Sequence, residues 1–123
     1  MYYATVSHWF SAAHNLRNYQ GKCERIHGHN YKVEVELKSR GVDKVGMVTD
    51  FVAVRHELEK IIQRFDHQRL NEISPFDKIN PTAENIAKII FEEMSLKFNS
   101  KKVKVHLVSV WETEHAKAGY GPS

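Results

Sequence analysis

The sequence predicts an α+β domain in which two helices cover one face of a mostly antiparallel sheet. Apolar and charged residues alternate over residues 31–38, and this period of two is typical of a strand with one buried face. Two later segments, 51–65 and 83–97, carry apolar residues at steps of three and four, which is typical of amphipathic helices. Because these helices follow one another without a strand between them, helices and sheet are expected to form separate layers.

Two further strands are predicted near the ends of the chain. Residues 2–10 and 103–111 are rich in aromatic and β-branched side chains, and residues 47–49 could add a short strand. In both terminal strands the apolar residues fall on odd and even positions, so both faces of the sheet would carry apolar groups. Two helices cover only one face, and we therefore expect the other to be buried against further subunits.

Each predicted helix has a start signal. Asp50 or Thr49 can cap the first helix, and Thr82 can cap the second, where Glu84 favours the positive end of the helix dipole. The expected apolar stripes consist of Phe51, Val54, Leu58, Ile61, Ile62 and Phe65 in the first helix and Ile86, Ile90 and Met94 in the second.

The composition predicts a single domain spanning residues 1–123. Eighteen basic and fifteen acidic residues give a net charge of +3, which is too small to indicate a nucleic-acid partner. No apolar stretch approaches the ~18 residues of a membrane span, and no signal peptide is recognisable. The single cysteine excludes an intramolecular disulfide and fits a reducing compartment, so we expect a cytoplasmic protein. The unusual count is eight histidines.

The pair His27-Gly28-His29 is the sharpest chemical feature. On a strand its two imidazoles share a face, and two such histidines form half of a zinc site. His14 could supply a third ligand, although spacing does not select it over His8. Three histidine ligands would leave one position for water or substrate, as in catalytic zinc sites. The alternative is a turn with two histidines and no metal.

Three other groups are candidates for chemistry. Cys23 is the only thiol and lies in a polar, basic stretch, where it could act as a base or nucleophile; a small buried side chain is the alternative. Asp66 and His67 could form an acid–base pair, or could simply end a helix. Glu112 could bind N–H groups of a ligand where a strand ends. The histidines expected to be structural are His8, His56, His106 and His115.

Six motifs in order resemble one family. They are Phe10-Ser11-Ala12-Ala13-His14, Cys23-x3-His27-Gly28-His29-Asn30, Val48-Thr49-Asp50-Phe51, Asp66-His67-x-x-Leu70-Asn71, Asn80-Pro81-Thr82-Ala83-Glu84-Asn85 and Glu112-Thr113. Together they cover nearly the whole chain and resemble the 6-pyruvoyl-tetrahydropterin synthase and 6-carboxy-tetrahydropterin synthase family. The short Cys-x3-His-Gly-His spacing is similar to that of the 6-carboxy-tetrahydropterin synthases of queuosine (7-deazaguanine) biosynthesis.

The resemblance implies a role for each matching position. It implies zinc bound by His14, His27 and His29, Cys23 as catalytic base assisted by Asp66 and His67, Glu112 as the anchor of the pterin ring, and Thr82 and Glu84 in the pterin pocket. It also implies the T-fold, a four-stranded antiparallel sheet with two helices on one face. Trimers of this fold close into a barrel and stack in pairs, so a homohexamer with active sites between subunits is expected.

The implied reaction is a zinc-dependent lyase reaction on 7,8-dihydroneopterin triphosphate, giving 6-carboxy-tetrahydropterin, acetaldehyde and triphosphate. Charge alone suggests Lys22, Arg25 and Lys32 as partners of the triphosphate. Glu24 beside Cys23 matches relatives in which a glutamate is the base, so a 6-hydroxymethyl-dihydropterin product for folate synthesis, or a 6-pyruvoyl product, is the alternative. A zinc-stabilised binding module without turnover is the third reading.

Overall fold

The computed structural model describes residues 1–18 and 25–123, so the predictions for Lys22, Cys23 and Glu24 concern residues outside the described part. Its sheet has the strand order β3-β1-β2-β4-β5. The strands are β1 (Tyr2–His14), β2 (His27–Ser39), β3 (Gln68–Arg69), β4 (Val103–Thr113) and β5 (Ala116–Tyr120), and the α-helices are α1 (Phe51–Gln63) and α2 (Ala83–Phe98). Apart from the β1–β3 pair, neighbouring strands are antiparallel.

The alternating strand is confirmed at the centre of the sheet. β2 pairs with β1 from Tyr2 opposite Ser39 to His14 opposite His27. The apolar positions of β2 are fully buried beneath the helices and are Tyr31, Val33, Val35 and Leu37. Both strands continue past their predicted ends, because the polar residues of the His14 and His27 motifs also pair across the ladder.

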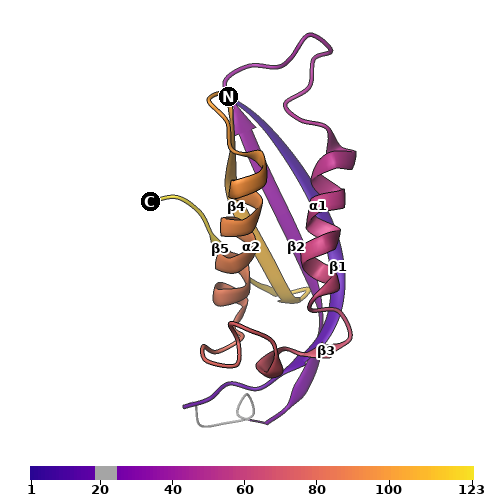
Figure 1. Cartoon of the computed structure of the whole chain (residues 1–123), viewed down its shortest axis with the longest axis vertical. Coiled ribbons are helices and arrows are strands. Elements are labelled where there is room, and N and C mark those ends of the chain that lie inside the picture. Colours follow the sequence, from indigo (N-terminus) through magenta and orange to yellow (C-terminus); the bar gives the residue numbers. More distant parts are fainter. Residues whose placement is uncertain (19–24) are drawn as a thin grey trace.

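Both helices lie on the same face of the sheet, as predicted (Figure 1). Asp50 caps α1 by accepting from the Val52 N–H, and Thr82 caps α2 by accepting from the Asn85 N–H. The helix α1 ends two residues before the predicted boundary, yet Phe65 is still fully buried in the turn that follows. Four apolar residues of α1 and five residues of α2 are buried against the sheet, namely Val54, Leu58, Ile61, Ile62, Ala83, Ile86, Ala87, Ile90 and Met94.

The prediction that β4 carries apolar groups on both faces is confirmed, because Leu107 and Trp111 lie opposite Glu36 and Lys32 on the uncovered face, but the predicted division of its valines between the faces is wrong. The register shifts between Glu36 and Leu37 of β2, because β4 has one extra residue, His106, at this point, so Val105 pairs with Leu37 whereas Val108 pairs with Val35. As a result Val105 and Val108 are both buried on the helix side despite their opposite parity. In β1 the prediction also holds, because Tyr3 and Trp9 remain more than half exposed on the uncovered face.

Two further differences concern short elements. Residues 47–49 form no strand; they leave a turn in which the Asp43 carboxylate accepts from the Val45 and Met47 N–H groups. The sheet has five strands and not four, because β5 and the two-residue β3 add to its edges. No helix in the described residues has the length and apolar character needed to cross a membrane.

Candidate functional site

Three histidines meet where β1 ends and β2 begins. His14 lies directly opposite His27 in the ladder, and Ala12, on the same face as His14, lies opposite His29. All three side chains therefore leave the sheet on the helix-covered face. Each offers a ring nitrogen, and these nitrogens lie within 4.8 Å of one another. The register thus selects His14, and His8 instead lies 3.4 Å from the Glu59 carboxylate of α1.

Backbone carbonyls orient two of the three rings. The Nδ1 of His14 lies 2.7 Å from the Pro81 carbonyl oxygen, and the Nδ1 of His27 lies 2.7 Å from the Arg25 carbonyl oxygen. A carbonyl accepts only, so each Nδ1 carries the proton and each Nε2 presents a lone pair. A histidine that donates its second N–H in this way is typical of metal ligands.

The positions and hydrogen-bond partners of the remaining ring nitrogens show whether a cation fits between them. The Nε2 atoms of His14 and His27 lie 2.9 Å apart, so two lone pairs face each other. The Nε2 of His29 is buried and, among the residues that the structure describes, has no hydrogen-bond partner. A metal ion between these nitrogens would satisfy all of them. The histidine group therefore fits a metal ion.

Burial keeps two of these imidazoles neutral. Desolvation is the main cause that lowers the pKa of His14, and it is also the main cause for His29. The Glu112 carboxylate opposes this lowering in both cases. Neutral imidazole is the form that binds metal, so the site is prepared for a ligand role near neutral pH. The Tyr31 hydroxyl, 3.1 Å from the His14 Nδ1, is buried, and this burial raises its pKa.

Two asparagines hold the chain that leaves β1 in place. Asn71 accepts from the Asn15 N–H and donates to the Asn15 carbonyl, each at 2.9 Å. Asn80 makes the same pair of bonds with the backbone of Arg17, also at 2.9 Å. Each side chain thus satisfies backbone groups that a neighbouring strand would otherwise pair with. Residue type and spacing alone did not predict this role for Asn71 and Asn80.

The predicted Asp66–His67 pair forms. The Nδ1 of His67 lies 3.1 Å from a carboxylate oxygen of Asp66, and the same oxygen accepts from the Ser11 N–H at 2.9 Å. This Ser11 bond is the main cause that lowers the pKa of Asp66. His67 has a φ of 57°, a strained conformation for a residue with a side chain, and its ring is 81% exposed. The pair is therefore oriented and accessible, and an imidazole held by a carboxylate in this way has the arrangement that acid–base chemistry needs.

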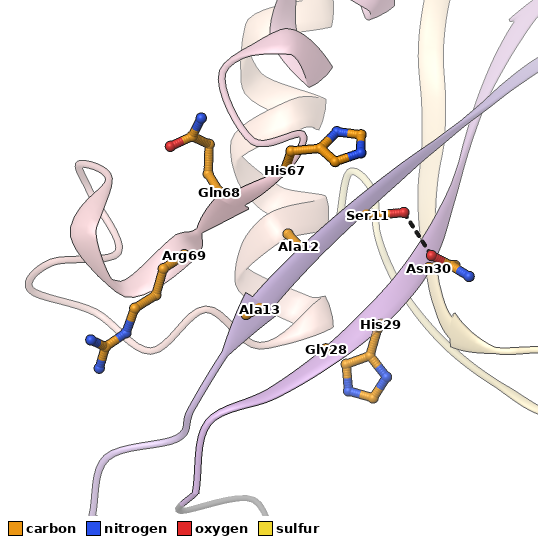
Figure 2. A pocket seen from close by; sticks show the side chains of 9 residues that line it. All are labelled: Ser11, Ala12, Ala13, Gly28, His29, Asn30, His67, Gln68 and Arg69. Carbon is orange, nitrogen blue, oxygen red and sulfur yellow. Dashed lines mark hydrogen bonds between the residues drawn. The ribbon is translucent and has the colours of Figure 1, made fainter.

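The pair does not join the three histidines within one chain. β3, which directly follows His67, lies outside β1 at the edge of the sheet. His67 lines a pocket of about 530 Å³ together with His29, Ser11 and Asn30, and the side chains of Ser11 and Asn30 leave the face opposite the histidines. Figure 2 shows His67 beyond β1, whereas His29 projects from β2. Among the described residues, no hydrogen bond or ion pair joins His67 to the histidine group, although His29 lines the same pocket.

The other predicted site residues lie at different distances from the histidines. Glu112 is close, since its carboxylate is 3.9 Å from the His29 Nε2. Thr82 directly follows Pro81, which holds His14, but its hydroxyl oxygen serves as the helix cap. Glu84 is exposed in the first turn of α2.

The two described residues suggested for the triphosphate diverge. Lys32 lies on the uncovered face, 5.9 Å from the centre of the Trp9 ring. Arg25 has its carbonyl at His27. The two residues that were suggested from their charge therefore do not lie together in the structure. Sequence patterns did not predict that the Pro81 and Arg25 carbonyls orient the rings of His14 and His27, because a backbone acceptor has no side-chain signature.

Comparison with known proteins identifies the family. The family model described as 6-pyruvoyl tetrahydropterin synthase matches residues 3–123. The chain belongs to the 6-pyruvoyl tetrahydropterin synthase family. Members of this family are enzymes, and the prediction of a lyase similar to the 6-carboxy-tetrahydropterin synthases is confirmed at this level.

Two relatives and one solved structure illustrate the similarity. An Archaeoglobus fulgidus protein, provisionally named 6-carboxy-5,6,7,8-tetrahydropterin synthase, is 41% identical over 81% of this chain and 83% of its own length. The Synechocystis 6-carboxy-5,6,7,8-tetrahydropterin synthase is 34% identical over 90% and 86%, respectively. The structure of Caenorhabditis elegans 6-pyruvoyl tetrahydropterin synthase superposes with a TM-score of 0.82 at 29% identity and covers 100% of this chain and 98% of that chain. The predicted T-fold is thereby confirmed.

Proposed function

We propose that this protein is a zinc-dependent lyase that converts 7,8-dihydroneopterin triphosphate and water to 6-carboxy-5,6,7,8-tetrahydropterin, acetaldehyde and triphosphate. The observation that carries the proposal is the histidine group, in which backbone carbonyls fix two rings so that their free nitrogens converge. The names of the two sequence relatives support the choice of product. This product is the one expected of queuosine biosynthesis in the cytoplasm, and residues 1–123 would form a single catalytic domain.

In this proposal His14, His27 and His29 hold the zinc ion. A bound zinc ion supplies Lewis acidity, which lowers the pKa of hydroxyl groups next to it. Cys23, which follows β1 in the chain and precedes His27, would remove a proton from the substrate side chain. Glu112 lies beside His29 and would accept hydrogen bonds from the pterin ring. Thr82 and Glu84, at the start of α2, would line the same pocket near Pro81.

The Asp66–His67 pair would serve the site of a neighbouring subunit. Three observations support this: the ring is accessible, it lies at the edge of the sheet, and among the described residues it makes no hydrogen bond or ion pair with the histidine group of its own chain, although His29 lines the same pocket. One edge of β1 pairs with β2, and among the described residues its other edge pairs only with the two residues of β3. The rest of this outer edge can therefore pair with another copy of the chain. A hexamer of two trimers would then place each pair at a subunit boundary.

The second candidate is a different product from the same substrate. Cys23 and Glu24 are adjacent in the sequence, so either could act as the base, and the matching Caenorhabditis elegans structure is a 6-pyruvoyl tetrahydropterin synthase. A 6-pyruvoyl or 6-hydroxymethyl product would then replace the 6-carboxy product. The C23A variant separates these possibilities, because a glutamate base would still form the hydroxymethyl product.

The decisive experiment incubates the zinc-loaded protein with 7,8-dihydroneopterin triphosphate and identifies the products by mass. The expected result is 6-carboxy-tetrahydropterin with acetaldehyde. Another pterin product would replace the first proposal with the second, and bound zinc without turnover would favour a binding module. In parallel, H27A is expected to lose metal, whereas H115A, which changes an exposed histidine far along the chain, is expected to keep it. Full metal content in H27A would refute the assignment of the ligands.

A further inference from the structure

A basic cleft lies at the end of the sheet opposite the histidine group. Its lining residues are Met1, Lys38, Ser39, Arg40, Lys101, Lys102 and Lys104, and its volume is about 540 Å³. Lys38 and Ser39 end β2, whereas His27 begins it. Twelve steps along this strand correspond to roughly 40 Å, so the cleft is separate from the proposed metal site of the same chain.

The cleft concentrates positive charge far above the average of the chain. Five of the eighteen basic residues line it, and no acidic residue does. The other thirteen basic residues are outnumbered by the fifteen acidic residues, so the rest of the chain has a net charge of −2 although the total is +3. The net positive charge of this protein is therefore concentrated in the basic cleft.

In the part of the chain that the structure describes, the five basic residues of the cleft also lack the carboxylate partners that other basic residues have. Elsewhere Lys60 pairs with Glu57 and Arg64 with Glu93. Within the described ranges, none of the five lies within ion-pair distance of a carboxylate. Asp43 is near enough to Lys102 to feel its charge, but its lowered pKa is caused first by the Met47 N–H and by other backbone groups.

Pairing in the sheet brings two of these charges together. Lys38 lies directly opposite Lys104 on the neighbouring strand β4. Like charges at directly opposed positions destabilise a sheet, and a single substitution would relieve the repulsion. The Nζ of Lys102 donates to the Val42 carbonyl at 2.8 Å, which holds a third ammonium group beside the cleft. A bound polyanion would offset the repulsion between Lys38 and Lys104 and would thereby stabilise this part of the sheet.

We propose that this cleft binds an oligophosphate, either as the free ion or as the tail of a nucleotide. Several cations arranged around a cavity match an anion that spreads several charges over many oxygen atoms. Arg40 adds a planar donor that can bind two phosphate oxygens at once. The volume lies within the range of small-molecule sites and exceeds the need of a single small anion.

The test measures binding of inorganic triphosphate to the metal-free H27A protein by calorimetry, so that the proposed metal site does not contribute. We expect the double variant K38Q/K104Q in this background to bind at least about tenfold more weakly. The matched control is K60Q/K97Q, which removes two positive charges from a surface where Glu57 and Glu93 are also present. This control is expected to retain binding.

A second variant separates binding from folding. K104E would place a carboxylate opposite Lys38, so the melting temperature should be maintained or raised at low salt while triphosphate binding is lost. Comparing triphosphate, ATP and adenosine identifies the source: tighter binding of ATP than of triphosphate, without binding of adenosine, indicates a nucleotide tail. The proposal is overturned if triphosphate does not bind, or if K38Q/K104Q binds it as tightly as the control. Turnover of the pterin substrate is not measured, so failure here leaves the proposed function untouched.

Discussion

Division of the catalytic groups between chains predicts that two inactive variants restore each other. H27A removes one proposed metal ligand, and H67A removes the exposed half of the Asp66–His67 pair. Each variant alone should be inactive in the proposed reaction. If a site takes its histidine group from one subunit and its Asp–His pair from a neighbour, a mixed oligomer contains some sites in which both are intact.

The size of the recovery follows from the arrangement. In a random equal mixture, a site has an intact histidine group with a probability of one half and an intact neighbouring Asp–His pair with the same probability. About one quarter of the sites should therefore be complete, and activity should return to about one quarter of the wild-type value. If both groups came from the same chain, every site would lack one of them and no activity would return.

The assay is product formation by the two variants expressed together, with incorporation of both chains checked by mass. The matched control mixes H27A with H14A. These substitutions affect one histidine group within one chain, as the ladder pairing of the two residues shows, so mixing cannot repair any site. Recovery no greater than in this control would refute the assignment of the Asp–His pair to the neighbouring site.

Three further predictions concern stability. N71A removes two hydrogen bonds to the backbone of Asn15 and should lower the free energy of unfolding by about 1–3 kcal/mol, measured in urea, whereas Q68A should have little effect. L58A removes a fully buried side chain and should cost about 2–5 kcal/mol, whereas L96A, at 87% exposure, should change stability by less than about 0.5 kcal/mol; equal effects would contradict the packing of α1. Because burial lowers the pKa values of the site histidines below 6.5, the unfolded chain binds more protons just below this pH. The metal-free protein should therefore lose stability as the pH falls through 6.5, and constant stability between about pH 7.5 and about pH 5.5 would contradict this.

Sequence patterns predicted the main elements because each of these elements has one clear periodicity. Residues 31–38 alternate, and both helices have an apolar stripe with a capping residue in front. β5 was missed because its residues, Ala116–Tyr120, include two alanines and a glycine, which have little preference for strands. Its pairing with β4 depends on a partner that is close in space, so tertiary contacts decide where local preference is weak.

The predicted division of the β4 valines between the two faces failed for a physical reason. Odd and even positions indicate opposite faces only while the ladder is regular, and the bulge beside Leu37 breaks this rule. Val105 and Val108 then share the helix side. Nothing in the local sequence marks His106 as the extra residue, since neither it nor its neighbours Val105 and Leu107 are glycines.

In the candidate site, too, the local sequence predicted some residues, whereas the choice of others depended on their positions in space. Residue type and spacing predicted His27 and His29, but the choice between His14 and His8 required either the family resemblance or the register. In the structure that choice depends on a single relation, the pairing of His14 with His27 across the ladder. Because side chains alternate along β1, His8 leaves the sheet on the same face as His14, but six residues away, next to Glu59. Distance along the strand, and not the face, therefore excludes His8, and the Pro81 carbonyl then fixes the ring of His14 for its role.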